Sequence, residues 1–473
     1  MSLIHLVILL VYAIAVAAFI VAVLMDNRQP AKTMAWVMVL TFVPVAGMAL
    51  YFFFGQNTRR KRLISQRSLD QLSKRQMLEF VDQKNLRIPE TYRTLIQLFA
   101  NQNTSLPFKD NEVDIYTSGY QFFPALLQAI ASARHHIHLD TYIFEDDALG
   151  RLVADALIAK AHQGVEVRLI YDDVGCWQVS GRFFERLREE GIDAHAFMPV
   201  KFRAFTSKVN YRNHRKLCVI DGTTAFIGGM NIAKRYVSGR HHRPWRDTHL
   251  RIRGGAVYAI QRAFLVDWYF VDRTLITHRA YYPPLPTAPN DCLAQVVTSS
   301  PIALWPDIMQ GYVRILLEAK RYVYIETPYF LPTEPILFAM RTAAIAGIDI
   351  KLMIPRKSDA KLVEWASMPY VRDALEAGIT ICLYDEGFNH SKLMVCDDTL
   401  CTCGSANVDF RSFENNFEAN IFFYDTAMAL RIKQVFMTDL AHCTLLHTVD
   451  DLPRQSFGRR LWQSVIRLLA PLM

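Results

Sequence analysis

A polar pattern that occurs twice constrains the fold of this chain more than any other feature. Residues 213–217 read NHRKL and residues 389–393 read NHSKL. In both copies an aspartate follows the histidine by seven residues, a glycine by fourteen and an asparagine by seventeen. These residues are Asp221 and Asp397, Gly228 and Gly404, and Asn231 and Asn407. A duplication of this kind predicts two related modules whose polar residues meet at one site.

Short β-branched runs alternate with helical runs around both copies. The runs 137–144 and 165–171 precede the first copy, and the runs 322–325 and 348–354 precede the second. The segment 137–144 also aligns with 323–330, since IHLDTYIF matches VYIETPYF in its apolar positions. Such alternation is typical of α/β units. The sequence therefore predicts an α/β fold with two α/β/α modules related by a pseudo-twofold axis.

The spacing inside each copy indicates which side chains share a face. Residues two apart on a β-strand point to the same side, so His214 and Lys216 face the same way. Asp221 has the opposite parity and is expected at the following turn, in a supporting position. The alternative is a set of ordinary strand residues with local ion pairs. It does not account for the second copy, in which His390 and Lys392 have a matched glycine and asparagine.

Two uncharged runs at the N-terminus predict membrane attachment. At about 1.5 Å per residue, the run 3–25 spans about 34 Å, enough to cross a bilayer's hydrocarbon. The run 34–54 contains Pro44 and Gly47, which membrane helices tolerate. A secretory signal is the alternative for the first run, but no basic start precedes it and a second apolar run follows at once. We expect a transmembrane helical hairpin within residues 1–56.

Charge and composition set the expected orientation and domain limits. Basic residues at 59–62 and 67 follow the second run with no acid among them, so the positive-inside rule keeps the rest of the chain in the cytoplasm. The expected parts are a connector at 57–110, modules at 111–289 and 290–446, and a tail at 447–473. In the tail, arginines alternate with large apolar residues, which favours a helix at the membrane interface over a core helix.

Composition narrows the partners and the compartment. The chain has 53 Lys and Arg against 45 Asp and Glu, a net charge of +8, which suits nucleic acid or anionic lipid. Hydrophobic residues make up 51%, which excludes a disordered chain. The 8 cysteines are widely spaced, so a reducing compartment is expected rather than a disulfide framework.

The two H-x-K-x-x-x-x-D motifs with their trailing G-x-x-N resemble those of the phospholipase D superfamily. Within it, the chain is most similar to the bacterial cardiolipin synthases. That second resemblance is carried by the two apolar runs, by TPYFLP at 327–332, and by the segment 404–418, which begins GSANVDFRS. The chain departs from the common pattern at Gly229, where many members have serine, as the second copy does at Ser405.

The resemblance implies a phosphatidyltransferase. Such an enzyme moves a phosphatidyl group from one phosphatidylglycerol to another, releases glycerol, and passes through a phosphatidyl-histidine intermediate. The residues expected to be catalytic are His214, Lys216, Asp221, His390, Lys392 and Asp397. Those expected to bind phosphate oxygens with the lysines are Asn231 and Asn407. Those expected to orient the histidines are Asp247 and Glu418.

The resemblance also implies roles and a location. In this family the first histidine, here His214, is the usual nucleophile and His390 the acid and base, although the near symmetry of the copies leaves the exchange open. No cofactor and no metal is expected. The expected partners are phosphatidylglycerol, cardiolipin and the bilayer, without nucleic acid, and the oligomeric state is left open. The implied location is the bacterial inner membrane, with several membrane passes and cytoplasmic modules.

Three other functions use part of the same pattern. With water or another alcohol as the acceptor, the site would be that of a phospholipase D or a phosphatidylserine-type synthase. A nuclease of the superfamily fits the net charge of +8 but is disfavoured by two membrane spans. A non-enzymatic membrane scaffold has no need of two complete polar sets.

Three further groups have simpler interpretations. The cysteines within 396–403 lie in an apolar strand-like stretch, where core packing is expected rather than a metal site. His136, His138 and Asp140 share a strand face, and packing is favoured there over zinc binding. The basic run 234–246 borders the proposed site and is either a solvated loop or a site for anionic head groups.

Overall fold

The computed structural model describes residues 3–25, 30–51, 88–103, 105–200, 210–240, 243–285, 290 and 292–472. The basic residues at 59–67, most of the expected connector, and residues 241–242 of the basic run lie outside the described residues. The chain divides into two units, one with residues 1–62 and 200–211 and the other with residues 63–199 and 212–473.

The described residues of the first unit include the helices α1 (Leu3–Met25), α2 (Pro30–Phe42) and α3 (Pro44–Leu50). Among the described residues, α1 is the one helix that is long and apolar enough to cross a membrane. The second expected span is not a single helix, because α3 begins at Pro44, which has no N–H to donate, after a break at Val43. Val23, Leu40 and Tyr51 form a small core between the helices. The multi-pass arrangement therefore stays a prediction.

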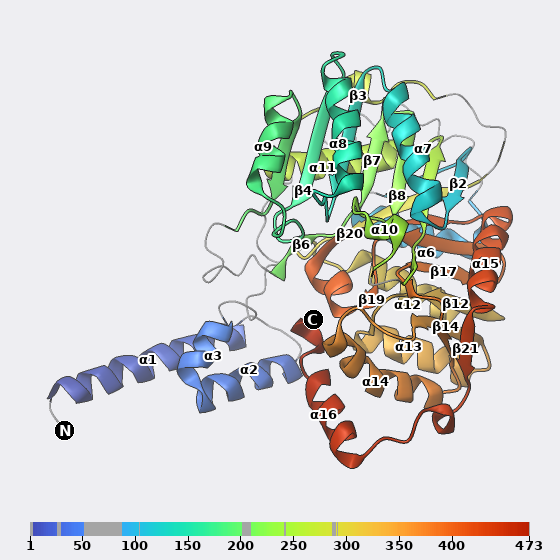
Figure 1. Ribbon diagram of the computed structural model, residues 1–473. Helices are drawn as coiled ribbons and strands as arrows, with labels where there is room; N and C mark the ends of the chain where they lie inside the picture. The colour runs from blue at the N-terminus through green and yellow to red at the C-terminus, as the bar shows by residue number, and fades with distance from the viewer. Residues whose placement is uncertain are drawn as a thin grey trace. The chain divides into compact units, whose positions relative to one another are not determined.

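The first sheet of the second unit has seven strands in the order β2-β10-β8-β7-β3-β4-β5, and β3, β4 and β5 are parallel. These strands are β2 (Glu112–Tyr116), β3 (His136–Thr141), β4 (Glu166–Asp172), β5 (Asp193–Phe197), β7 (Leu217–Ile220), β8 (Thr224–Gly228) and β10 (His249–Arg253). On one face lie α7 (Gly119–Ser132), α8 (Ala148–Ala161) and α9 (Gly181–Glu189), and on the other lies α11 (Ala256–Asp272) (Figure 1).

The second sheet follows the order β1-β11-β20-β18-β17-β12-β14-β15-β21. Its strands are β1 (Pro107–Phe108), β11 (Ala294–Ser299), β12 (Tyr322–Glu326), β14 (Asp349–Pro355), β15 (Thr380–Tyr384), β17 (Leu393–Cys396), β18 (Leu400–Gly404), β20 (Asn416–Phe423) and β21 (Cys443–Leu446). On one face lie α6 (Arg93–Asn103), α12 (Asp307–Glu318), α13 (Glu334–Ile345) and α14 (Lys361–Glu376), and on the other lies α15 (Thr426–Leu440). The last long helix is α16 (Phe457–Arg467).

Both sheets use the same connections around the repeated pattern. Strand β3 pairs with β7 antiparallel and with β4 parallel, and β12 pairs with β17 and β14 in the same way. The hairpins β7–β8 and β17–β18 follow the two histidines, and β10 and β20 add the next strands. The expected mixed α/β fold with two similar modules is confirmed. The pseudo-twofold relation and the domain limits stay predictions.

Apolar packing and short strand pairs join the modules. One hydrophobic core contains Leu250 and Trp268 from the first module together with Ala419 and Phe436 from the second. Strand β6 (Arg212–Asn213) pairs with β20, and β9 (Trp245–Arg246) pairs with β16 (Phe388–Asn389). Each repeated histidine therefore follows a short strand that is bonded to the other module.

Candidate active site

The backbone around each repeated histidine is fixed by the opposite module. The N–H of His214 donates to the carbonyl of Phe417 at 2.9 Å, and the N–H of His390 donates to the carbonyl of Arg246 at 2.6 Å. Residues 214–216 and 390–392 lie between two strands rather than within one, so the expected continuous strand is interrupted here. Both histidines are buried, as are Lys216 and Lys392.

Each histidine pairs with a carboxylate of the other module. The Nδ1 atom of His214 lies 3.0 Å from both oxygens of Glu418, and the Nδ1 atom of His390 lies 2.7 Å from Oδ2 of Asp247. All four side chains are buried. The sequence singled out both carboxylates but did not indicate which histidine each one holds. The crosswise pairing means that neither module completes a histidine–carboxylate pair alone.

Burial sets the charge state of the histidines and lysines. It lowers the pKa of His214 to about 4 against the opposing effect of Glu418, and, together with the charges of the two lysines, it lowers the pKa of His390 well below its usual value. Burial also lowers the pKa of Lys216 to about 7 and that of Lys392 to about 8. At neutral pH the site thus holds neutral imidazoles beside lysines that exchange protons readily.

The two carboxylates differ in their surroundings. Burial raises the pKa of Asp247, whereas His214 and Lys216 outweigh burial at Glu418 and lower its pKa. The hydroxyl of Ser405 donates to Oε2 of Glu418 at 2.5 Å. The corresponding residue of the first copy is Gly229, and a Cβ atom there would lie 2.1 Å from Oδ1 of Asp247. The departure noted at Gly229 therefore makes room for the Asp247 carboxylate.

The two asparagines lie near the site but are already bonded. Nδ2 of Asn231 donates to the hydroxyl of Tyr236 at 2.6 Å, and its Oδ1 accepts from the N–H of Ile143 at 3.1 Å. Nδ2 of Asn407 donates to Asp409 at 3.1 Å. Each amide nitrogen retains a second hydrogen, so phosphate binding by both residues stays a prediction.

The aspartates of the repeated pattern lie at the turns, as expected, and away from the imidazoles. Asp221 accepts from the backbone N–H groups of residues 134, 135 and 136 at 2.8, 2.7 and 3.0 Å. Asp397 makes the same three contacts with residues 320, 321 and 322, at 2.7, 2.8 and 3.0 Å. Each carboxylate thus fixes the start of the strand beside the histidine-bearing hairpin.

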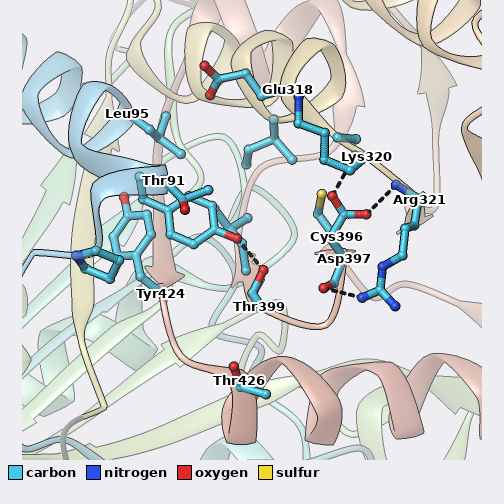
Figure 2. Close-up of a pocket in the computed structure, with 15 residues that line it drawn as sticks. Thr91, Leu95, Glu318, Lys320, Arg321, Cys396, Asp397, Thr399, Tyr424 and Thr426 are labelled. Atoms are coloured by element: carbon cyan, nitrogen blue, oxygen red, sulfur yellow. Dashed lines mark hydrogen bonds between the residues drawn. The ribbon is translucent and has the colours of Figure 1, made fainter.

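A cavity of about 490 Å³ lies beside Asp397 in the second module (Figure 2). Asp397 and Arg321 line it together with Tyr92 and Tyr424, and neither histidine does. The cavity is therefore separate from the histidine pair. Because Asp221 and Asp397 bind backbone N–H groups at the turns, they are positioning residues rather than groups that touch a reacting atom.

Sequence reasoning missed the aromatic wall around the histidines. The Tyr142 ring lies 5.0 Å from that of His214, and the rings of Trp245, Phe388 and Tyr329 lie 5.4, 5.7 and 6.3 Å from that of His390. Trp245 and Phe388 lie two residues before Asp247 and His390, and this proximity along the chain was the available signal. The rings place aromatic surface beside both imidazoles.

A second feature missed from sequence is a pair of buried arginines. Arg215 donates to Asp267 on α11. In the second copy the equivalent position is Ser391, and Arg246 from the first module donates to Asp439 on α15, at 3.0 Å from Nε and 2.6 Å from the terminal nitrogen. Arg246 also donates to the Ser391 hydroxyl at 2.9 Å. In each half, one guanidinium is therefore bonded to a buried carboxylate on a helix. In the first half the arginine comes from the same module as the helix, and in the second half it comes from the other module.

The basic run is partly paired, and the other polar clusters are buried; head-group binding by the run stays a prediction. Within 234–246, Arg235 pairs with Glu145, and only part of the run remains exposed for head groups. His136 and His138 share Gln261, at 3.1 and 2.7 Å, as expected for packing. The cysteines at 396–403 are buried in β17 and β18. Among the described residues, no group of three or more His, Cys, Asp and Glu side chains is placed to hold a metal ion.

Comparisons with known proteins agree with this geometry. A family model described as cardiolipin synthase, PLD-like domain, matches residues 126–245 and 312–440, and one described as phospholipase D-nuclease N-terminal matches residues 8–56. The major cardiolipin synthase of Bacillus subtilis (strain 168) is 38% identical, with 100% of both chains covered. A cardiolipin synthase of Clostridium perfringens (strain SM101 / Type A) is 37% identical, with 95% of both chains covered.

A solved structure shares the fold. The phosphatidylserine synthase of Haemophilus influenzae Rd KW20 superposes with a TM-score of 0.62 at 14% identity, over 81% of this chain and 100% of that one. Together with the two matched repeats and the full-length relatives, this likeness places the duplicated modules in a known class of fold. The chain belongs to the cardiolipin synthase family of the phospholipase D superfamily.

Proposed function

We propose that the protein is a phosphatidyltransferase that makes cardiolipin from two phosphatidylglycerol molecules and releases glycerol. Full-length similarity to cardiolipin synthases supports the activity. The observation that carries the mechanism is the crosswise pairing of His214 with Glu418 and of His390 with Asp247. Two imidazoles whose Nδ1 atoms are held by carboxylates present their Nε2 atoms for opposite roles at one phosphorus atom.

In the first step, Nε2 of His214 attacks the phosphorus of the donor lipid. The bond from phosphorus to the glycerol oxygen breaks, and that oxygen takes a proton from His390. In the second step, neutral His390 takes the proton of a hydroxyl on a second phosphatidylglycerol, whose oxygen attacks phosphorus. The phosphorus–nitrogen bond then breaks, which frees His214 and completes cardiolipin.

The charges of the site suit this assignment. A pKa of about 4 keeps His214 neutral and nucleophilic at pH 7, with the ionised Glu418 holding its Nδ1 proton. Lys216 and Lys392 donate to the non-bridging oxygens, as Asn231 and Asn407 do with their remaining amide hydrogens. The negative phosphodiester raises the pKa of His390 when it binds, which loads the acid needed for the first step.

The proposal also covers architecture and location. Residues 111–289 and 290–446 form modules related by a pseudo-twofold axis that passes between the two histidines. The helices α1, α2 and α3 enter the inner membrane of a bacterium as a hairpin with both ends in the cytoplasm. Reporter fusions after residue 55 and at residue 473 test this topology, and a periplasmic signal at either point contradicts it.

Product analysis tests the activity. The purified full-length protein in detergent, given phosphatidylglycerol alone, is expected to form cardiolipin and glycerol without CTP. Activity that EDTA abolishes and a divalent metal restores would contradict the mechanism. Mainly phosphatidic acid, from transfer to water, would favour the phospholipase D alternative. The covalent step is tested with a donor chiral at phosphorus: two displacements retain its configuration, whereas direct transfer inverts it.

A further inference from the structure

The C-terminal helix α16 packs on the protein through a narrow mixed face, which is polar at Gln463 and apolar at Ile466. Gln463, Ile466 and Ala470 are buried against the second module, where α14 is the neighbouring helix. The Arg467 guanidinium lies 4.6 Å from the centre of the Tyr370 ring on α14, and its terminal nitrogen lies 3.6 Å from Asp373. The helix is therefore firmly seated, and its orientation about its own axis is fixed.

The opposite side of α16 is apolar and exposed. Its large side chains are Phe457, Leu461, Trp462, Val465, Leu468 and Leu469. Phe457 is 82% exposed, Leu468 77% and Leu461 54%. At about 100° per residue, these positions fall on the half of the helix facing away from Gln463. An amphipathic helix on a globular protein normally buries its wide apolar face, whereas α16 leaves that face exposed and buries Gln463 and Ile466.

We propose that this apolar face of α16 inserts into the interfacial region of an anionic lipid bilayer. This inference rests on the proposed function, because the substrates of that reaction are anionic lipids in such a bilayer. Charge complementarity favours lipid over protein: residues 452–473 contain four arginines and no acid. Arg460 falls near the border between the apolar face and the docked face, where it reaches phosphate groups, and Arg459 is exposed in the first turn of the helix.

The seat of the helix connects the bilayer to the site. Leu362 on α14 is also exposed, and the rings of Trp365 and Trp462 lie 6.5 Å apart, so the apolar surface continues from α16 onto α14. In turn, α14 contacts β13 (Phe330–Leu331), which directly follows Tyr329 in the wall around His390. The lipid-facing surface and the aromatic wall of His390 thus belong to the same module. Insertion of α16 sets the distance between the site and the head groups.

The first test uses the full-length protein in vesicles of phosphatidylglycerol and phosphatidylcholine. Leu468→Cys carries an environment-sensitive fluorophore, and Gln434→Cys on exposed α15 carries the same label as a control, with labelled wild type correcting for Cys443. The label at 468 is expected to be quenched by a lipid-attached quencher and shielded from iodide. The label at 434 is expected to behave in the opposite way. Iodide quenching at 468 would overturn the proposal.

The second test separates membrane contact from chemistry. Leu461→Glu with Leu468→Glu adds charge at exposed positions, and Leu430→Glu, at a position 46% exposed on α15, is the matched control. The double variant is expected to lose at least about tenfold in rate on vesicles while keeping its rate in mixed micelles. Equal rates on vesicles would overturn the proposal. Shielding at 468 that depends on protein concentration and appears without lipid would also overturn it, in favour of a second copy of the chain. Loss of activity in micelles by wild type would instead contradict the proposed function.

Discussion

Replacing Arg246 is expected to cost both stability and activity. Its side chain is nearly buried, as is that of Asp439, and the pair has two parallel hydrogen bonds at 3.0 and 2.6 Å. Removal of one partner of such a buried pair costs about 3–5 kcal/mol, because the other charge stays buried without compensation. The Glu326 carboxyl adds to this penalty. Burial raises its pKa, and the neighbouring Asp439 raises it further. Arg246→Ala should therefore lower the unfolding free energy by about 4 kcal/mol.

The other half of the molecule suggests how to restore the loss. There the arginine is Arg215. The residue before Glu418, the carboxylate that holds His214, is Phe417, and its ring lies 5.6 Å from the Arg215 guanidinium. The double variant Arg246→Phe with Ser391→Arg copies this arrangement into the second half. It should regain most of the stability that Arg246→Phe alone loses, since the new guanidinium replaces the old one on Asp439.

Thermal unfolding in detergent, followed by circular dichroism, measures both effects, and cardiolipin formation measures the consequence for His390. Arg243→Ala, in the same segment but exposed, is the control and should leave the midpoint unchanged. An unchanged midpoint for Arg246→Ala would refute the view that the pair is structural. A double variant no more stable than Arg246→Phe would refute the equivalence of the two halves.

Three further predictions concern the site and its supports. Asp221→Ala removes the acceptor of three backbone N–H groups and should lower the unfolding free energy by about 3 kcal/mol in denaturant titrations, with a smaller loss for Asp221→Asn. Gly229→Ser should lower kcat far more than it raises KM, because its Cβ atom displaces Asp247; an unchanged kcat would contradict this. The rate at subsaturating substrate should fall as pH rises through about 7 to 8, since Lys216 and Lys392 are cationic only below their depressed pKa values; a rate that stays flat to pH 9 would contradict their role.

The two histidines and two lysines that the structure buries in one site were predictable from sequence because the pattern occurs twice. One copy of the pattern around His214 and Lys216 was already informative, and the matched second copy made both positions specific. The turn position of Asp221 followed from strand parity alone. The partners of the histidines did not follow from sequence, because Glu418 lies 204 residues from His214 and only the packing of two modules brings them together.

The second membrane span shows the opposite limit. Hydropathy over residues 34–54 does not register the break at Val43. There Pro44, which has no N–H to donate, divides the run into two helices. The sequence favoured an interfacial helix in the tail, but its mix of arginines and large apolar residues does not say which residues of α16 meet the protein. That choice was made by Tyr370 and Asp373, which accept Arg467.

The crosswise pairs give a physical reason for the duplication itself. A lone module would hold a histidine whose Nδ1 faces no carboxylate, and a carboxylate without its imidazole, so neither group would be oriented. Joining the modules satisfies both pairs at once and brings two buried imidazoles, each held at Nδ1 by a carboxylate, into one site. The two histidine–carboxylate pairs nevertheless differ in their surroundings. Ser405 donates to Glu418 beside His214 and helps lower the pKa of that carboxyl, whereas Asp247, opposite Gly229, has a raised pKa and holds His390.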